Sequence, residues 1–299
     1  MGRLRAQRFM ARLKTFGTYG AGACCNRSML RLAHLSDLHF GAADPDALEE
    51  LKKAVAKAAP DLAIVTGDVT QAGRRREYAD ASAYFKTFEA PLFILPGNHD
   101  APVYSLPLRF VDPWKRFRNA FGAQTDAALH LQGATIVGLN SARRAAPSLD
   151  WSRGQISSAQ LRLTEQEFAL APAGAARIIA LHHPVIPGPG RAGAAVVGSA
   201  ETALEAFAKD KVDLILTGHV HVADADAHEH YGRSMIIARA GTATSTRVRG
   251  EAPSFNMIEL SEGRADIHTL SLGGDGYQST AQRRFVPATE GWRRALQPA

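Results

Sequence analysis

Cysteine is nearly absent from this sequence of 299 residues, which contains only the adjacent pair Cys24 and Cys25. Two neighbouring cysteines provide neither a disulfide framework nor the spacing of a zinc finger. The sequence therefore does not fit a small secreted domain held together by disulfides. A reducing compartment is the expected location, and we predict a cytoplasmic protein.

Long apolar runs are also missing. No stretch of about 18 apolar residues occurs, which argues against a transmembrane helix. Residues 1–28 lack the apolar segment of a secretory signal, although they are rich in arginine. We interpret residues 1–28 as a disordered basic tail, or as sequence upstream of a true start at Met29. A targeting arm is the alternative.

Acidic residues are missing from the N-terminal end, and this explains the net charge of +6. Six of the 35 basic residues lie in residues 1–30, namely Arg3, Arg5, Arg8, Arg12, Lys14 and Arg27. The remaining 29 basic residues are matched by 29 acidic ones, so the rest of the chain has no net charge. The isoelectric point of about 9.5 reflects this N-terminal end. It therefore does not indicate that the rest of the protein binds nucleic acid.

From residue 29 onward, strand-like and helix-like segments alternate. We expect strands at 31–35, 62–66, 92–95, 135–139, 177–181 and 212–217, and helices at 45–59, 74–88, 157–170 and 200–209. Such an order predicts parallel strands joined by helical crossovers. The helix at 45–59 has Asp44 as an expected N-cap, and the helix at 157–170 begins at an expected serine cap. Residues 102–126 are expected to form a loop with a short helix.

The C-terminal third follows another pattern. Strands at 234–240, 255–260 and 265–270 follow one another without helices, which predicts an antiparallel stretch that completes a second sheet. We expect one domain over residues 29–272. Residues 273–299 are rich in glycine and then polar, and we expect a C-terminal extension of low order.

Polar residues follow five of the predicted strands. These segments are Asp37-Leu38-His39, Gly67-Asp68, Gly97-Asn98-His99-Asp100, His182-His183-Pro184 and Gly218-His219-Val220-His221. Ligand sites in open α/β sheets collect at the carboxyl ends of the strands, so these side chains are expected to meet there. Carboxylate, amide oxygen and imidazole together suit Mn, Fe or Zn better than Mg or Ca alone. The sequence therefore predicts a metal site.

In this order, the five segments resemble the motifs of the calcineurin-like metallophosphoesterases, which read D-x-H, G-D, G-N-H-D, H and G-H-x-H. The resemblance implies an α/β fold, a four-layer αββα sandwich of two mixed sheets flanked by helices, with two divalent metal ions. It assigns one ion to Asp37, His39, Asp68 and His221. It assigns the second to Asp68, Asn98, His182 and His219, so that Asp68 bridges both.

The same resemblance leaves His99 without a metal to bind, and we expect it to act as general acid or to hydrogen-bond the phosphate. Two ions in such a pair are expected to activate a bridging hydroxide, which attacks the phosphorus in line. His183 and Arg247 are weaker candidates for substrate contacts. Asp100 is expected mainly to cap the next turn. The segment 241–251 has two open interpretations, an anion-binding loop or a solvated turn.

The motif wording is most similar to the bacterial 3′,5′-cyclic AMP phosphodiesterase branch of the family. We therefore expect a phosphodiesterase for cyclic AMP or a small diester, with its oligomeric state open and a dimer as one option. Hydrolysis of the pyrophosphate of a nucleotide-sugar lipid precursor is the alternative. A DNA nuclease and a non-catalytic scaffold of the same fold are less favoured, because the body lacks net positive charge and every motif position is filled.

Overall fold

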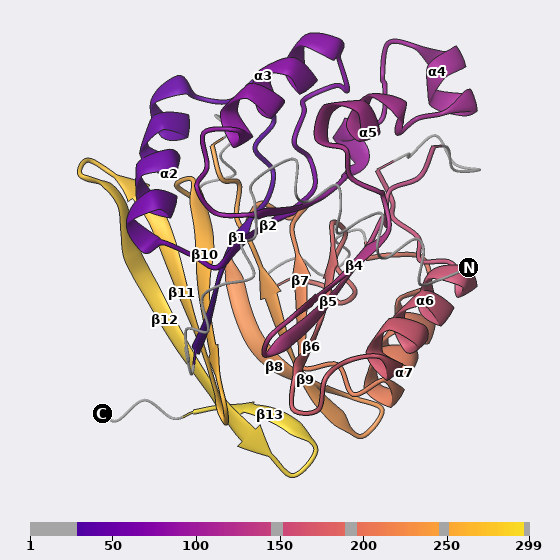
Figure 1. The fold of residues 1–299 in the computed structure, drawn as a ribbon, viewed down its shortest axis with the longest axis vertical. Helices are drawn as coiled ribbons and strands as arrows, with labels where there is room; N and C mark the ends of the chain where they lie inside the picture. Colours follow the sequence, from indigo (N-terminus) through magenta and orange to yellow (C-terminus); the bar gives the residue numbers. More distant parts are fainter. Residues whose placement is uncertain (1–28, 145–151, 189–195, 245–250, 296–299) are drawn as a thin grey trace.

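Strands and helices alternate through the first two thirds of the chain, and strands alone follow (Figure 1). The computed structural model describes residues 29–144, 152–188, 196–244 and 251–295. The elements in chain order are β1 (Met29–Leu35), α2 (Pro45–Ala58), β2 (Leu62–Thr66), α3 (Arg75–Phe85), β3 (Leu92–Leu95), the 3-10 helix η1 (Asn98–Asp100), α4 (Leu106–Val111), α5 (Lys115–Phe121), β4 (Ala127–Leu131), β5 (Ala134–Leu139), α6 (Ser158–Ala169), β6 (Ala176–Leu181), α7 (Ala200–Lys209), β7 (Leu214–Thr217), β8 (Asp224–His230), β9 (Arg233–Arg239), β10 (Ser254–Ser261), β11 (Arg264–Gly273), β12 (Gly276–Ala288) and β13 (Gly291–Arg294).

The strands form two mixed sheets. In the first, β1, β2 and β3 are parallel, as predicted, while β10, β11 and β12 run antiparallel to their neighbours on the other side of β1. In the second, β5, β6, β7 and β9 are parallel, with β4 and β8 antiparallel at their sides. β13 extends from β12 and pairs with β9 only through Gly291 and Ser234. The two sheets are therefore joined along the hydrogen-bonded path by one narrow link.

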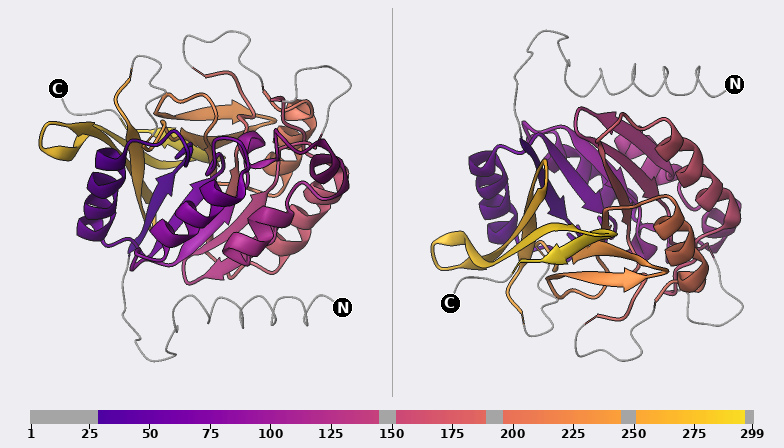
Figure 2. Two further views of the ribbon diagram at one scale, coloured as in Figure 1. Left: turned by 90° about the horizontal axis from the view of Figure 1, so that it is seen from above. Right: turned by 90° about the horizontal axis from the view of Figure 1, so that it is seen from below.

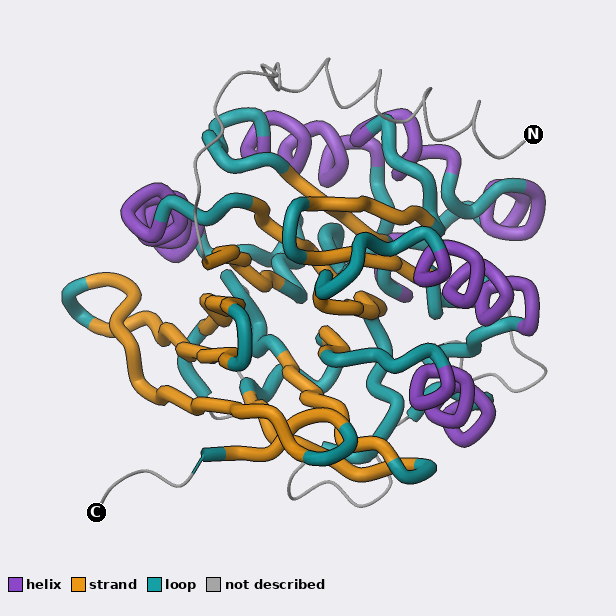
Figure 3. Tube along the Cα trace, turned by 60° about the horizontal axis from the view of Figure 1, so that its bottom comes forward, coloured by secondary structure: helices purple, strands orange, loops and turns teal. Residues whose placement is uncertain are grey.

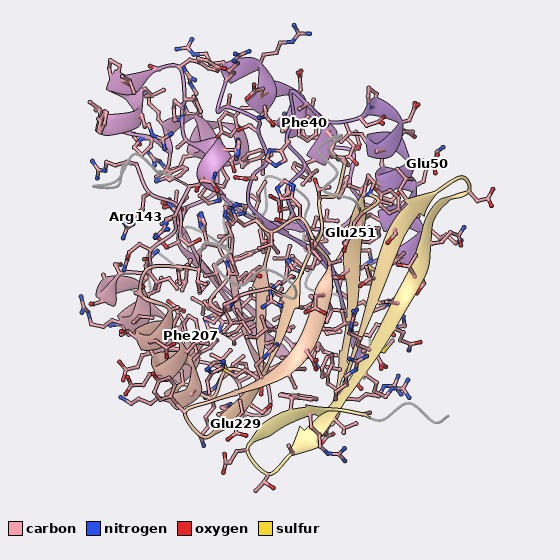
Figure 4. The ribbon with its side chains drawn as sticks, turned by 180° about the vertical axis from the view of Figure 1, so that it is seen from behind. Phe40, Glu50, Arg143, Phe207, Glu229 and Glu251 are labelled. Carbon is pink, nitrogen blue, oxygen red and sulfur yellow. The ribbon has the colours of Figure 1, made fainter. Side chains whose placement is uncertain are left out.

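Three clusters of buried apolar side chains separate four layers. The first cluster lies between the sheets and joins side chains such as Ile64 and Leu95 to Ile136 and Leu216. The second packs α2, α3 and α5 on the first sheet. The third packs α6 and α7 on the second sheet and includes Phe207, which is labelled in Figure 4. Figures 2 and 3 show the strands gathered between peripheral helices, which confirms the αββα sandwich.

Local sequence explains where the long helices begin. The side chain of Asp44 accepts hydrogen bonds from the backbone N–H groups of Asp46 and Ala47, and Pro45 supplies a first helical residue with no N–H to satisfy. Ser157 caps α6 by accepting a hydrogen bond from the backbone N–H of Gln160. Both caps were predicted from the sequence, and both are confirmed.

The structure corrects the predicted C-terminal third in two respects. Of the three strands expected to be antiparallel in the second sheet, only β9 belongs to that sheet, and it runs parallel to β7. β10 and β11 instead extend the first sheet. The expectation of low order over residues 273–299 is wrong for its described part, because 273–295 contains β12 and β13.

The segment 102–126 holds two short helices, α4 and α5, rather than one. The strands β4 and β8 were not predicted from the sequence. Within the described residues, the longest helix has 14 residues, and none has the length and apolar character that crossing a bilayer requires. The predicted bounds of the single domain remain a prediction.

Candidate metal centre

The five polar segments meet at one edge of the molecule because they all follow carboxyl ends of parallel strands. Asp37, Asp68 and Asn98 follow β1, β2 and β3 of the first sheet. His182 follows β6, and His219 follows β7, in the second sheet. Side chains far apart in the sequence, and on different sheets, are thereby brought within hydrogen-bond distance of one another.

One group of possible ligand atoms comprises Asp37, His39 and His221, whose atoms lie within 4.8 Å of one another. His221 Nε2 lies 3.1 Å from Asp37 Oδ1, and His39 Nε2 lies 3.7 Å from the same oxygen. All three side chains are buried. Their spacing is suited to a cation placed between a carboxylate oxygen and two imidazoles.

A second group surrounds the imidazole of His182. Its Nε2 lies 3.2 Å from Asp68 Oδ2, 3.1 Å from Asn98 Oδ1 and 3.3 Å from His219 Nδ1. His182 Nδ1 donates to the carbonyl oxygen of Thr66 at 2.8 Å, since a carbonyl can only accept. In the neutral ring this fixes the lone pair on Nε2, the form in which histidine binds a metal.

The carboxylate of Asp68 connects the two groups. Asp68 Oδ2 is 3.2 Å from His182 Nε2 and 3.9 Å from His39 Nε2. The side chain is almost fully buried. One carboxylate is therefore within reach of both sets of donors, in the position that the family resemblance assigns to a bridging ligand.

The backbone is strained at these positions. Five candidate ligands are non-glycine residues with positive φ, namely Asp37 (55°), His39 (51°), Asp68 (49°), His219 (70°) and His221 (61°). Such a conformation costs a non-glycine residue roughly 1–2 kcal/mol. The described residues contain only three other non-glycine residues of this kind, so the strain is concentrated at this edge of the sheets. Concentrated strain of this kind is typical of functional sites.

The donor set fits divalent cations. Among the described residues, neither ring nitrogen of the buried His39 has a hydrogen-bond partner. Buried polar atoms are almost always satisfied, so an imidazole without partners indicates that a ligand belongs beside it. With Asp37 and Asp68 on either side, that ligand is expected to be positively charged.

The electrostatics of the site are set by its carboxylates. Burial alone would raise the pKa of Asp37 and Asp68, but the charges of neighbouring histidines outweigh it and hold both pKa values below the ordinary range. Burial would also lower the pKa of His182, yet the charge of Asp68 outweighs it and raises that pKa to about 9. Burial lowers the pKa of His219 to about 4. The carboxylates therefore attract positive charge strongly.

Neighbouring segments hold the ligand loops in place. Asp100 does not cap the next turn as expected; its carboxylate accepts from the N–H groups of Gly97, Val69 and Thr70. The carboxylate thus ties the loop after β3 to the loop after β2. A Cβ at Gly97 would overlap Asp68 Oδ1, which explains a glycine at that position.

Two buried threonines of the segment 241–251 support the site and were not predicted as site residues. Thr242 Oγ1 donates to the carbonyl of Asp37 at 2.8 Å, and Thr244 Oγ1 donates to the carbonyl of Leu38 at 3.0 Å. Residues 241–244, the described part of the segment 241–251, therefore hold the loop after β1 that carries Asp37 and His39. Its signal was the run of small residues that permits close backbone approach.

His99 lies beside the ligand groups and is held by its backbone and one ring nitrogen. Its N–H donates to Asp68 Oδ1 at 2.8 Å, and its Nδ1 donates to the carbonyl of Gln71 at 2.8 Å. The ring packs edge-on against His39, with centroids 4.9 Å apart. Because Nδ1 is engaged, Nε2 is the nitrogen left for a proton transfer.

The structure describes one of the two weaker candidates for substrate contacts, His183, and does not describe the other, Arg247. His183 is fully buried; its Nδ1 lies 2.8 Å from Ser141 Oγ and its Nε2 2.7 Å from the carbonyl of Ser152. Both ring nitrogens are engaged by the protein, so we assign His183 to loop positioning rather than substrate binding. Arg247 lies outside the described residues.

The fold and the grouped donors are those of a metal-dependent phosphoester hydrolase. The model of the calcineurin-like phosphoesterase family matches residues 30–223, and the chain belongs to that family. The 3′,5′-cyclic adenosine monophosphate phosphodiesterase CpdA of Escherichia coli K12 is 28% identical in an alignment of 246 residues that covers 78% of this chain and 80% of CpdA.

Two further proteins are similar. A 3′,5′-cyclic-nucleotide phosphodiesterase of Nostoc sp. is 24% identical in an alignment of 260 residues that covers 77% of this chain and 88% of that protein. The crystal structure of a dimetal phosphatase from Danio rerio superposes with a TM-score of 0.62, at 15% identity, over 87% of this chain and 99% of that one. This last likeness concerns the fold alone.

Proposed function

We propose that this protein is a dinuclear metal-dependent phosphodiesterase that hydrolyses 3′,5′-cyclic AMP or a similarly small diester. The observation that carries the proposal is the position of Asp68, whose Oδ2 lies near His182 of one donor group and His39 of the other. One shared carboxylate between two donor sets is the arrangement that a pair of cations requires.

We assign the ligands in two sets. The first set is Asp37, His39, Asp68 and His221, and the second is Asp68, Asn98, His182 and His219. The mixture of oxygen and imidazole donors favours Mn or Fe, with Zn as the alternative. Bound there, divalent ions would supply a water of lowered pKa and would screen the charge that develops on the phosphoryl oxygens.

The chain itself supplies the proton for the leaving group. His99 keeps Nδ1–H on the carbonyl of Gln71, so its protonated ring presents Nε2–H to the leaving oxygen. The backbone N–H of His99 on Asp68 fixes the ring relative to the donor groups. A positioned general acid of this kind typically contributes about 10²–10⁴ in rate.

The choice of substrate is supported by the similar proteins. CpdA and the Nostoc protein both have names that specify cyclic-nucleotide phosphodiesterases, and the chain covers most of each. Residues 31–299 also lack the net positive charge that a DNA nuclease uses to hold its polyanionic substrate.

The proposal is tested with purified protein loaded with Mn²⁺. We expect hydrolysis of bis(p-nitrophenyl) phosphate that EDTA abolishes and Mn²⁺ restores. A screen of 3′,5′-cyclic AMP, glycerophosphodiesters and a nucleotide-sugar lipid pyrophosphate should give the highest kcat/KM for the cyclic nucleotide. Protein that binds two equivalents of metal and hydrolyses none of these compounds contradicts the proposal.

A further inference from the structure

The short helix α4 has its apolar and charged residues in the opposite places from an ordinary surface helix. Arg109 is 3% exposed, and its guanidinium donates to the carbonyls of Arg144, Ala101 and Pro102. Val111, by contrast, is 82% exposed. Soluble proteins rarely bury an arginine and expose aliphatic residues on the same helix, so this arrangement indicates a surface with a function.

Exposed apolar side chains are concentrated around this helix. Of the seven large apolar side chains that are exposed in the described residues, five lie between residues 103 and 111. We call Val103, Tyr104, Leu106 and Val111 the α4 surface; their exposures are 48%, 73%, 52% and 82%. Figure 1 shows α4 at an outer corner of the molecule, next to α5, away from the core of the sheets.

A basic groove reaches the same helix through Leu108. It has a volume of about 790 Å³ and lies between α3 and α5. Its charged lining residues are Arg75, Lys86, Lys115 and Arg116, with no carboxylate among the lining side chains, and Leu108 of α4 lines it as well. The groove and the α4 surface therefore share helix α4, although residues 31–299 together carry no excess of positive charge.

We propose that the α4 surface and the basic groove dock this protein on an anionic lipid membrane. Apolar side chains flanked by lysine and arginine are the combination that binds the interface of an anionic bilayer, where side chains enter the acyl boundary and cations meet the phosphates. Tyr104, whose ring lies 4.4 Å from the guanidinium carbon of Arg74, adds an amphipathic residue of the type found at that depth.

Charge decides between a membrane and a second copy of this chain. A symmetric dimer through this face would bring two copies of the same basic patch together, because a two-fold interface uses the same surface of both subunits. No carboxylate in the groove lining offsets that repulsion. An anionic bilayer instead supplies negative charge over the whole contact.

Co-sedimentation of the full chain with lipid vesicles tests the docking. At about 100 mM NaCl, we expect binding to phosphatidylcholine vesicles containing a quarter phosphatidylglycerol, and weak binding to pure phosphatidylcholine. The variant R75Q/K115Q should bind about 25-fold more weakly, since each cation near an anionic surface contributes a factor of about five. The variant L106S/V111S should bind at least about tenfold more weakly.

Control substitutions elsewhere on the surface test whether the effect is specific to this patch, and the six positive charges of residues 1–30 are the same in every variant. Leu170 is 72% exposed outside the patch, and Lys209 is an exposed cation at the end of α7. L170S and K209Q should bind like the wild type, and all variants should keep the wild-type circular dichroism and Tm. Inorganic phosphate at matched ionic strength should not displace the protein.

Four results would overturn the proposal. They are a wild type that does not distinguish anionic from neutral vesicles, test variants that bind like the wild type, controls that lose binding equally, and release of the protein by free phosphate. If light scattering showed a dimer that L106S/V111S converts to a monomer, the surface would be assigned to self-association instead.

Discussion

Asp100 Oδ1 accepts two hydrogen bonds from Thr70, one from its backbone N–H and one from its hydroxyl, each at 2.8 Å. The other oxygen, Oδ2, accepts from the N–H groups of Gly97 and Val69. The hydroxyl of Tyr78 donates to the carbonyl of Asp100 at 2.7 Å. A single buried carboxylate thus fixes the relative position of the loops that carry Asp68 and Asn98.

Replacing Asp100 with asparagine should therefore loosen the site. In D100N the amide N–H₂ replaces one of the two accepting oxygens, so at least one backbone N–H loses its acceptor. We expect about 2–4 kcal/mol less stability in urea unfolding, the usual cost of leaving buried donors unsatisfied. We also expect at least about tenfold weaker Mn²⁺ binding by calorimetry. D275N, in the turn before β12, is the control, and equal effects in both variants would refute the assignment.

Asp68 and His99 should separate metal binding from catalysis. Since Asp68 lies between the two donor groups, D68A should lose both metal ions when measured by elemental analysis. H99A should keep both ions and lose about 10²–10⁴ in kcat, because only the proton donor is removed. Equal metal loss in the two variants would show that His99 is a ligand.

The buried Arg239 forms an ion pair with the partly buried Asp224 that links two ligand loops. Arg239 Nη1 lies 3.1 Å from Asp224 Oδ2, and Nη2 donates to the carbonyls of Ile186 and Pro187 in the loop after His183. R239M should cost about 1–3 kcal/mol in urea unfolding, because it leaves the partly buried carboxylate of Asp224 and two carbonyls with fewer donors. R239M/D224N should cost less than the two single variants combined. Strict additivity would show that the pair is not coupled.

His34 should make stability depend on pH. Its side chain is fully buried in β1, and burial lowers its pKa from 6.5 to about 3. Between pH 6.5 and about pH 3, His34 therefore binds a proton in the unfolded chain but not in the folded chain. The contribution of His34 to stability is complete above pH 6.5 and is lost progressively as the pH falls toward 3.

Comparison with a variant that does not titrate measures this contribution. In H34Q, the free energy of unfolding should fall less steeply between pH 7 and pH 4 than in the wild type, by about 3–4 kcal/mol over that range at most. The slope, not the absolute stability, is the readout, since the substitution also changes the 3.0 Å contact with Thr66 Oγ1. Parallel curves would show that His34 binds its proton in the folded state.

The sequence predicts the site better than the periphery of the fold. Asp37, Asp68 and His182 follow short buried strands, and the rule that parallel strands end at one edge is enough to bring them together. The mixture of ligand types then indicates a cation. Neither step needs knowledge of side-chain packing, which is why residues far apart in the chain could be grouped correctly.

Two of the strands that were not predicted, β8 and β12, have weak apolar faces. In β8 the inward residues are only Ala225 and Ala227, between Asp and His residues, so the two-residue period carries little apolar signal. In β12 the buried apolar residues Tyr277 and Phe285 are separated by a long polar stretch. Pairing with β11, not local composition, makes β12 a strand. The burial of Arg109 likewise depends on carbonyl groups that only the folded chain assembles.

The candidate ligands come from both sheets, with Asp37, Asp68 and Asn98 on one and His182 and His219 on the other. A chain whose sheets have not yet docked holds only half of a chelating set, so tight binding is possible only for the finished fold. Divalent metal that binds only this fold would stabilise it by an amount that grows with the logarithm of the free metal concentration. Supply of the metal in the cell would accordingly govern how long each molecule escapes proteolysis, in addition to how fast it turns over substrate.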